Sequence, residues 1–175
     1  MFKSIIFTIQ FGIVGLMSVS AQTVTIPIKT KNNTIVLQTN KDNLLRTVYF
    51  GESIGDDAEY SMINGMSHYD DGGTGINNAV YTASGTWNLS KPTIKIKHAD
   101  GNASLELKYV SHKQELVADN ITLTSIILKD PLYKFQVTLF YKAWTDLNVI
   151  EQWTEIKHSE PKNVVLEKFA SANLY

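Results

Sequence analysis

Strand-forming and turn-forming residues alternate along the second half of the chain. Between residues 120 and 175, four segments rich in Val, Ile, Leu, Thr, Phe and Tyr are separated by Asp130-Pro131, Thr145-Asp146 and Ser159-Glu160-Pro161. Strand formers interrupted at regular intervals by turn residues predict a meander of long antiparallel strands. One face of the second segment would carry Phe135, Val137, Leu139, Tyr141 and Ala143. A half-buried strand gives this alternation, and Phe140 on the polar side indicates that this side is partly covered as well.

The first part of the chain predicts shorter strands. Residues 23–28, 34–39 and 44–50 are apolar and β-branched, with polar connections between them. Pro27 lies in the first of these segments, and it has no amide hydrogen to donate to a neighbouring strand. We therefore expect the first strand to lie at the edge of a sheet.

A second group of short strands surrounds a glycine turn. Residues 93–97 and 104–110 alternate between apolar and polar positions on either side of Asp100-Gly101-Asn102, a strong turn signal. This arrangement predicts a hairpin, and residues 112–117 form one further strand candidate. Beyond the N-terminal segment no stretch has helical periodicity over about 11 residues. The sequence therefore predicts an all-β domain built from two large, stacked antiparallel sheets.

Residues 51–91 show neither the two-residue alternation of a strand nor the 3.6-residue period of a helix. They are rich in Gly, Asp, Asn and Ser, and so long a stretch without regular structure is unusual in a compact domain and often functional. It carries aromatic and acidic residues in polar company, among them Tyr69, Asp70, Asp71, Tyr81 and Trp87. Either the aromatic residues fold back onto the sheet from a surface excursion, or these residues contact a sugar or a neighbouring subunit.

The N-terminus predicts export. Lys3 is followed by an apolar run up to Met17 and by small residues that end at Ala21. This pattern is typical of a secretory signal peptide cleaved after Ala21, which would make residue 22 the first of the mature domain, residues 22–175. The apolar run is shorter than the roughly 20 residues of a spanning helix, so we expect no stable membrane span. A helix over residues 4–18 would not belong to the mature fold, and the product would be periplasmic or extracellular.

Composition and charge exclude several kinds of function. With 175 residues, 43% of them hydrophobic and 19% charged, the chain can form one globular domain. Its net charge of −1 comes from interspersed acidic and basic residues, so no basic surface for nucleic acid is expected. The absence of cysteine removes disulfides, thiolate metal sites and cysteine nucleophiles.

The candidate catalytic patterns are weak. Glycoside hydrolysis needs two carboxyl groups about 5–9.5 Å apart, and the candidate pairs are Asp56-Asp57, Asp70-Asp71 and Glu151 with Glu155. Neighbouring residues of an extended chain point in opposite directions, and the two glutamates would lie roughly 13 Å apart along one strand. The Asp70-Asp71-Gly72-Gly73 run lacks the ligand spacing of a calcium loop. The histidines lack metal-ligand spacing, and no serine lies in a nucleophile elbow. We expect no catalytic residue, no metal site and no cofactor.

Several runs in the second half resemble a known family. They are His98-Ala99-Asp100-Gly101-Asn102, Leu105 to His112, Lys129-Asp130-Pro131, Val149 to His158 and the closing Ala170 to Tyr175. In order and spacing these runs resemble the N-terminal β domain of glycoside hydrolase family 36 α-galactosidases. The resemblance is best from about residue 92 onward and weaker over residues 34–81. Residues 81–91 lack a Gly-Asp-(Tyr/Phe)-Arg-like loop that many members have.

The resemblance implies a fold and a role. Members have a β-supersandwich domain, similar to galactose mutarotase, before a catalytic (β/α)8 barrel that supplies both catalytic aspartates, and neither aspartate matches a position here. The resemblance therefore implies a non-catalytic accessory domain, truncated at its C-terminal end and inactive alone, whose partner is the barrel. It also implies α-galactosyl oligosaccharides of the raffinose type as substrates of the whole enzyme, and a homo-oligomer formed with that enzyme. The alternative is a stand-alone, secreted carbohydrate-binding β-sandwich module.

Overall fold

The fold is almost entirely antiparallel β-structure. A computed structural model of the chain describes residues 23–63, 78–85 and 91–172. The described elements, in chain order, are β1 (Thr25–Lys29), β2 (Asn33–Thr39), β3 (Leu45–Glu52), α1 (Asp57–Tyr60), β4 (Lys95–Lys97), β5 (Lys108–Ala118), β6 (Ile121–Lys129), β7 (Phe135–Trp144), β8 (Val149–His158) and β9 (Val165–Lys168). The helix is a single turn, so the all-β prediction is confirmed. The predicted signal segment lies outside the described residues.

The first sheet has the order β1-β2-β3, with both strand pairs antiparallel. β1 lies at its edge, which confirms the prediction from Pro27. A β-bulge interrupts the pairing of β2 with β3 between Val36 and Leu37. One side of this sheet is covered by Tyr60 of α1, whose side chain is 1% exposed and whose hydroxyl contacts the Thr34 hydroxyl at 3.2 Å. Its other side faces the second sheet.

The second sheet is the meander that the sequence predicts. It has the order β5-β6-β7-β8, and each strand pairs antiparallel with the next. The buried face of β7 carries Phe135, Val137, Leu139, Tyr141 and Ala143, all 2% exposed or less. On the other face Phe140 stacks on Trp153 of β8 with ring centroids 5.1 Å apart. Both the alternation and the partly covered second face are therefore confirmed.

The predicted hairpin between residues 93–97 and 104–110 is wrong. β4 pairs instead with β9, with Ile96 opposite Leu166. The turn itself forms, since the Gly101 amide donates to the His98 carbonyl at 2.9 Å. Beyond the turn, however, the Leu105 amide donates to the Ser84 carbonyl at 3.0 Å, which holds this segment away from β4. Regular pairing begins only at Lys108, and β5 then runs through both segments that the pattern had separated.

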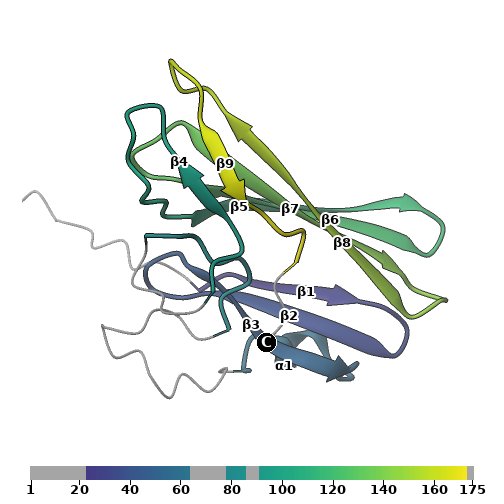
Figure 1. Ribbon diagram of the computed structural model, residues 1–175. Coiled ribbons are helices and arrows are strands. Elements are labelled where there is room, and N and C mark those ends of the chain that lie inside the picture. Colours follow the sequence, from purple (N-terminus) through teal and green to yellow (C-terminus); the bar gives the residue numbers. More distant parts are fainter. Residues whose placement is uncertain (1–22, 64–77, 86–90, 173–175) are drawn as a thin grey trace, which may run out of the picture.

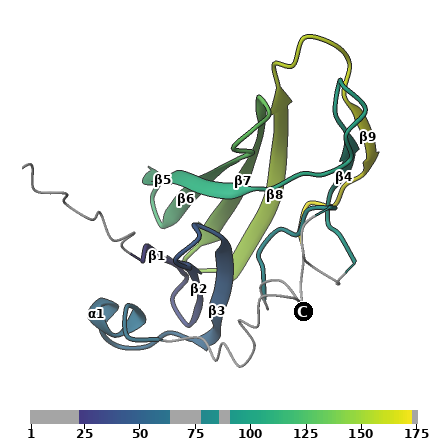
Figure 2. The same ribbon diagram turned by 90° about the vertical axis from the view of Figure 1, so that its left-hand side faces the viewer.

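The two larger sheets stack face to face, and β4 and β9 lie at one end of the stack (Figures 1 and 2). Apolar side chains from both sheets form one core between them. Its fully buried members include Ile26, Ile28, Leu37, Ile126, Val137 and Leu139. Burial of such side chains contributes about 25 cal/mol per Å² of apolar surface before chain entropy is counted. In the described part of the chain, no helix has the length and apolar character needed to cross a membrane.

Candidate functional site

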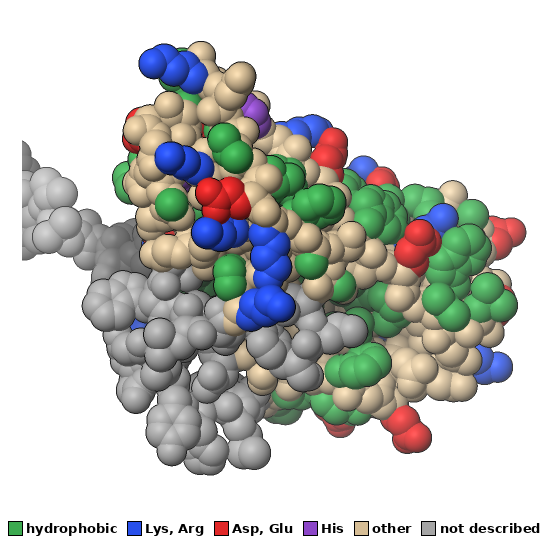
Figure 3. All heavy atoms as spheres, viewed as in Figure 1, with side chains coloured by type: hydrophobic (Ala, Val, Ile, Leu, Met, Phe, Trp, Pro, Cys, Tyr) green, Lys and Arg blue, Asp and Glu red, His purple; other side chains and the backbone are tan. Residues whose placement is uncertain are grey.

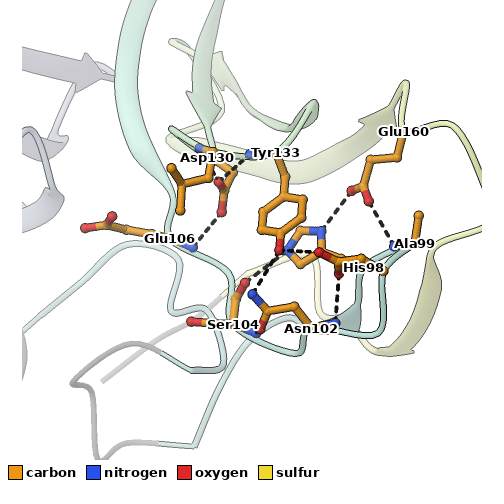
Figure 4. A network of polar contacts seen from close by, with 10 residues as sticks. His98, Ala99, Asn102, Ser104, Glu106, Asp130, Tyr133 and Glu160 are labelled. Atoms are coloured by element: carbon orange, nitrogen blue, oxygen red, sulfur yellow. Dashed lines mark hydrogen bonds and ion pairs between the residues drawn. The ribbon is translucent and has the colours of Figure 1, made fainter.

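Polar side chains from three separate turns meet at the end of the sandwich where β4 lies (Figure 4). His98 follows β4, Tyr133 lies between β6 and β7, and Glu160 follows β8. The His98 side chain is fully buried and that of Glu160 is 4% exposed. A buried polar group must find hydrogen-bond partners inside the protein, so this cluster determines how the three turns fit together.

His98 uses both ring nitrogens. Nε2 lies 3.0 Å from the Ser104 carbonyl oxygen, and Nδ1 lies 2.8 Å from Oε1 of Glu160. A carbonyl can only accept, so Nε2 donates to it, and the contact of Nδ1 with Oε1 is a hydrogen bond that joins the ring to the Glu160 carboxyl group. The other carboxyl oxygen of Glu160 accepts from the Ala99 amide at 2.9 Å. Glu160 is thereby fixed to the turn that follows β4.

Tyr133 connects this pair to the surface. Its ring stacks on the His98 ring with centroids 3.6 Å apart, and its hydroxyl donates to Oδ2 of Asp100 at 2.8 Å. The Asn102 side-chain amide donates to the same hydroxyl, and the Asn102 backbone amide donates to Oδ1 of Asp100. The hydrogen bonds from the Asn102 amide and the Tyr133 hydroxyl lower the pKa of Asp100 below its ordinary value. The Asp100 carboxyl group therefore favours its ionised form.

Asp130 organises the neighbouring turn in the same way. Its Oδ1 accepts from the amides of Leu132 and Tyr133, and its Oδ2 accepts from the Glu106 amide at 2.9 Å. The residue is 8% exposed. Three backbone donors on one carboxylate indicate a structural turn cap.

The carboxyl groups of this cluster do not form a hydrolytic pair. Asp100 and Glu160 both line a hollow of about 530 Å³ beside the cluster. Each of their four carboxyl oxygens already has a hydrogen-bond partner within the protein. The Glu160 side chain is 4% exposed and both its oxygens are bonded to His98 and the Ala99 amide, so this carboxyl group is not placed to reach a substrate. The geometry instead makes the cluster a clamp that holds three turns together.

The carboxylate pairs singled out in the sequence have other roles where they are described. Asp56 caps α1, because its Oδ1 accepts from the Ala58 amide at 2.9 Å. Glu151 and Glu155 are exposed on β8, and Glu155 forms an ion pair with Lys157 at 2.9 Å. Within the three described ranges, no group of three or more His, Asp or Glu side chains is placed to hold a metal ion.

The predicted contact residues lie mostly outside the described residues. These are Tyr69, Asp70, Asp71 and Trp87. Tyr81 is described and is 6% exposed, and its hydroxyl donates to the Ala170 carbonyl at 2.9 Å. Burial raises the pKa of its hydroxyl. Tyr81 thus packs in the core, and a sugar or subunit contact from the 51–91 segment remains a prediction.

Sequence reasoning did not find a second hollow, of about 260 Å³, between β3 and the β7–β8 pair. Phe50 and Thr47 of β3, Tyr141 of β7 and Gln152 of β8 line it, together with Asn78. One signal was available, because Gln152 is a polar residue at an inward position of β8, between Ile150 and Thr154. The residues of β3 that line the hollow with it lie about 100 residues earlier in the chain, and only the packing of the two sheets brings them together.

The fold and the clamp define a class of protein: a β-sandwich domain in which the carboxyl groups of the clamp bind and hold its turns. A family model for the glycosyl hydrolase family 36 N-terminal domain matches residues 43–175. The chain therefore belongs to this family of N-terminal domains. A comparison with curated proteins gives no match.

Solved structures share the fold at low sequence identity. The α-galactosidase AgaB from Geobacillus stearothermophilus is 17% identical, with a TM-score of 0.71 over 85% of this chain and 23% of that one. The α-galactosidase from Lactobacillus brevis is 18% identical, with a TM-score of 0.72 over 89% and 24%. A variant of AgaA from G. stearothermophilus in complex with raffinose is 18% identical, with a TM-score of 0.70 over 85% and 24%. The chain thus spans about a quarter of the length of these relatives, in which the domain accompanies a catalytic domain.

Proposed function

We propose that the chain is the non-catalytic N-terminal domain of an α-galactosidase-like glycoside hydrolase and packs against a catalytic (β/α)8 barrel outside these 175 residues. The observation that carries the proposal is the family match over residues 43–175. The occupied carboxyl groups of the clamp support it, since the domain would supply surface and rigidity but no bond-breaking group. In this role the stacked sheets form part of a supersandwich of the galactose-mutarotase type.

The outer face of β7 and β8 is the surface we assign to such packing. Here Phe140 stacks on Trp153, and the Lys142 ammonium lies 4.4 Å from the centre of the Trp144 ring. Val149, opposite Trp144 in the sheet, is 50% exposed. Figure 3 shows hydrophobic side chains gathered over the four-stranded sheet. Aromatic side chains are enriched at protein interfaces, whereas the solvent face of a sheet is usually polar.

Two measurements test the proposal. The purified chain should not hydrolyse an aryl α-galactoside, and any turnover that disappears on substitution of one of its carboxylates would contradict the proposal. The gene and its immediate neighbours should encode a domain of alternating strands and helices. If neither the same reading frame nor an adjacent one encodes such a domain, the proposal is wrong and a stand-alone carbohydrate-binding module becomes the better reading.

The longer product then allows the packing surface to be tested. Trp153→Lys should lower the melting temperature of the catalytic domain, because the substitution places a charge in an apolar interface. Lys113→Glu, on the distant strand β5, serves as the control and should leave the melting temperature unchanged. Full-length protein with Trp153→Lys that melts like the wild type would show that another surface packs against the barrel. The same material would establish whether the enzyme forms a homo-oligomer.

Export is part of this proposal. The apolar N-terminal run and the small residues before Gln22 support cleavage after Ala21. Intact-mass measurement of the protein from the periplasm or the medium should give a chain that begins at Gln22. Recovery of the uncleaved chain from the cytoplasm would contradict export.

A further inference from the structure

The hollow between β3 and the β7–β8 pair has an apolar wall with an exposed aromatic ring. Phe50 lies opposite Ile35 in the sheet, and both residues line the hollow. The Phe50 side chain is 74% exposed, although it extends from the sheet face that packs on the core. A large aromatic ring left open at the mouth of a hollow offers a flat surface for the apolar face of a ligand.

The opposite wall of the hollow is polar. Nε2 of Gln152 donates to the Tyr141 hydroxyl at 3.2 Å, and Tyr141 is 2% exposed. Burial raises the pKa of Tyr141, so its hydroxyl keeps its proton. Among the described residues, neither this proton nor Oε1 of Gln152 has a hydrogen-bond partner. One donor and one acceptor are therefore available side by side on residues that line the hollow.

Two further neutral polar residues line the hollow. Thr47 and Asn78 both line the hollow, and the side chain of neither forms a hydrogen bond within the described ranges. The backbone holds both in place, since the Thr47 amide donates to the Asn78 carbonyl at 2.9 Å. None of the described residues that line the hollow is charged. The hollow therefore favours a neutral ligand over an anion or a cation.

We propose that this hollow binds one neutral sugar ring, with Phe50 against the apolar face of the ring and with Tyr141 and Gln152 hydrogen-bonded to its hydroxyl groups. A pyranose combines an apolar face with several hydroxyl groups that can both donate and accept, as this arrangement requires. The volume of about 260 Å³ lies just below the range of about 300–1,000 Å³ for sites of drug-sized ligands, which suits a single ring. None of the described residues that line the hollow is one of the predicted contact residues of the 51–91 segment.

Only the choice of galactosides as probes rests on the proposed function. The full chain is titrated with galactose, melibiose, raffinose and glucose, and binding is followed by saturation-transfer NMR and by backbone amide shifts. At least one of these sugars should receive saturation, with shifts at Phe50, Gln152 and their neighbours. Binding of glucose alone would support the site and exclude galactosides as its ligands.

Two substitutions localise the binding. Phe50→Ala should weaken it about fivefold to tenfold by removing the ring. Gln152→Met keeps the length of the side chain but removes its amide, and should weaken binding about threefold to tenfold. Leu132→Ala is the matched control, because this leucine is 87% exposed and lies beside the clamp. Phe50 is also exposed, so its truncation should leave the circular dichroism spectrum of the folded chain unchanged.

The proposal has clear contrary outcomes. It is wrong if none of the four sugars receives saturation from the folded wild-type chain, or if Phe50→Ala and Gln152→Met bind as the wild type does. It is equally wrong if Leu132→Ala weakens binding as much as Phe50→Ala. None of these outcomes bears on the role as an accessory domain, which the hydrolysis assay and the neighbouring genes decide.

Discussion

Glu160 is the single residue whose truncation we expect to destabilise the clamp most. Glu160→Ala would leave Nδ1 of His98 and the Ala99 amide without partners in a buried environment. A buried polar group that is left without a hydrogen-bond partner costs about 1–3 kcal/mol of unfolding free energy, and this substitution leaves two. Urea unfolding followed by circular dichroism should show a loss of this size.

An exposed ion pair on β8, the strand that precedes Glu160, provides the control. Glu155→Ala removes a contact with Lys157 in which both side chains are more than 40% exposed, at 45% and 63%. Such pairs contribute about 0–1 kcal/mol, because water screens them and ordering the side chains costs entropy. Equal losses for the two variants would show that the His98–Glu160 contact does not stabilise the fold.

The exposed carboxyl group of Asp100 should make stability depend on pH in the acid range. Its pKa is lowered in the folded state, so its contribution is present above the ordinary value of 3.8 and is lost as pH falls through the lower folded value. Asp100→Asn should therefore lower the urea midpoint at about pH 6, and this difference from the wild type should shrink at about pH 3. Asp42→Asn, in an exposed turn, is the control and should not change the midpoint. A constant difference for Asp100→Asn would contradict the prediction.

At this scale the sequence identifies turns better than contacts. Asp100-Gly101-Asn102 is recognisable because only a few residue types favour such a turn, and Gly101 indeed has a φ of +94°. The contact of His98 with Glu160 joins positions 62 residues apart. Nothing in the local pattern indicates this contact, because it depends on how three turns pack together.

At the scale of elements, alanine substitutions at three glycines distinguish the cost of backbone strain from the cost of steric overlap. Gly101 has a positive φ but open space, since an added Cβ would lie 3.8 Å from the nearest atom, on Lys97. Gly101→Ala should therefore cost about 1–2 kcal/mol from backbone strain alone. Gly85 has a φ of +84°, and its Cβ would lie 2.5 Å from Cα of Ser104. Gly85→Ala should cost at least about 1 kcal/mol more, because the backbone of Ser104 must move.

Gly55 completes this series as the control. It has neither a positive φ nor an atom within 4 Å of an added Cβ. Gly55→Ala should leave the urea midpoint unchanged or raise it slightly, because alanine restricts the unfolded chain. A larger loss for Gly101→Ala than for Gly85→Ala would mean that the segment after the turn does not lie against Ser84.

Long elements could be predicted and short ones could not. β7 has ten residues, enough for the alternation to fix both its type and its buried face. β4 has three residues and β9 has four, and their pairing joins segments far apart in the chain. A pattern this short is compatible with any nearby partner. The predicted hairpin was the nearest one, whereas hydrogen bonding to Ser84 gives the chain a different path.

At the scale of the whole molecule, the two larger sheets depend on each other. Each sheet has one apolar face that must be buried against another element, and the core joins β1 and β2 to β6 and β7 without a break. The sequence predicts that two sheets stack, because each has one apolar face. It does not predict which strands lie opposite one another, and this is why the hollow between β3 and β8 could not be found from the pattern.

Truncation of one core side chain should therefore destabilise both sheets together. Leu37 of β2 is fully buried in the core, and Leu37→Ala should cost about 2–5 kcal/mol. In a Trp87→Phe background, fluorescence reports only Trp144 and Trp153, which lie on β7 and β8 of the opposite sheet. Their urea transition should shift to the same lower midpoint as the circular dichroism signal, while Met62→Ala, at a side chain 77% exposed, should shift neither. If the tryptophan transition kept its wild-type midpoint in Leu37→Ala, the four-stranded sheet would be stable without the other, and the continuous core would not be what holds the two together.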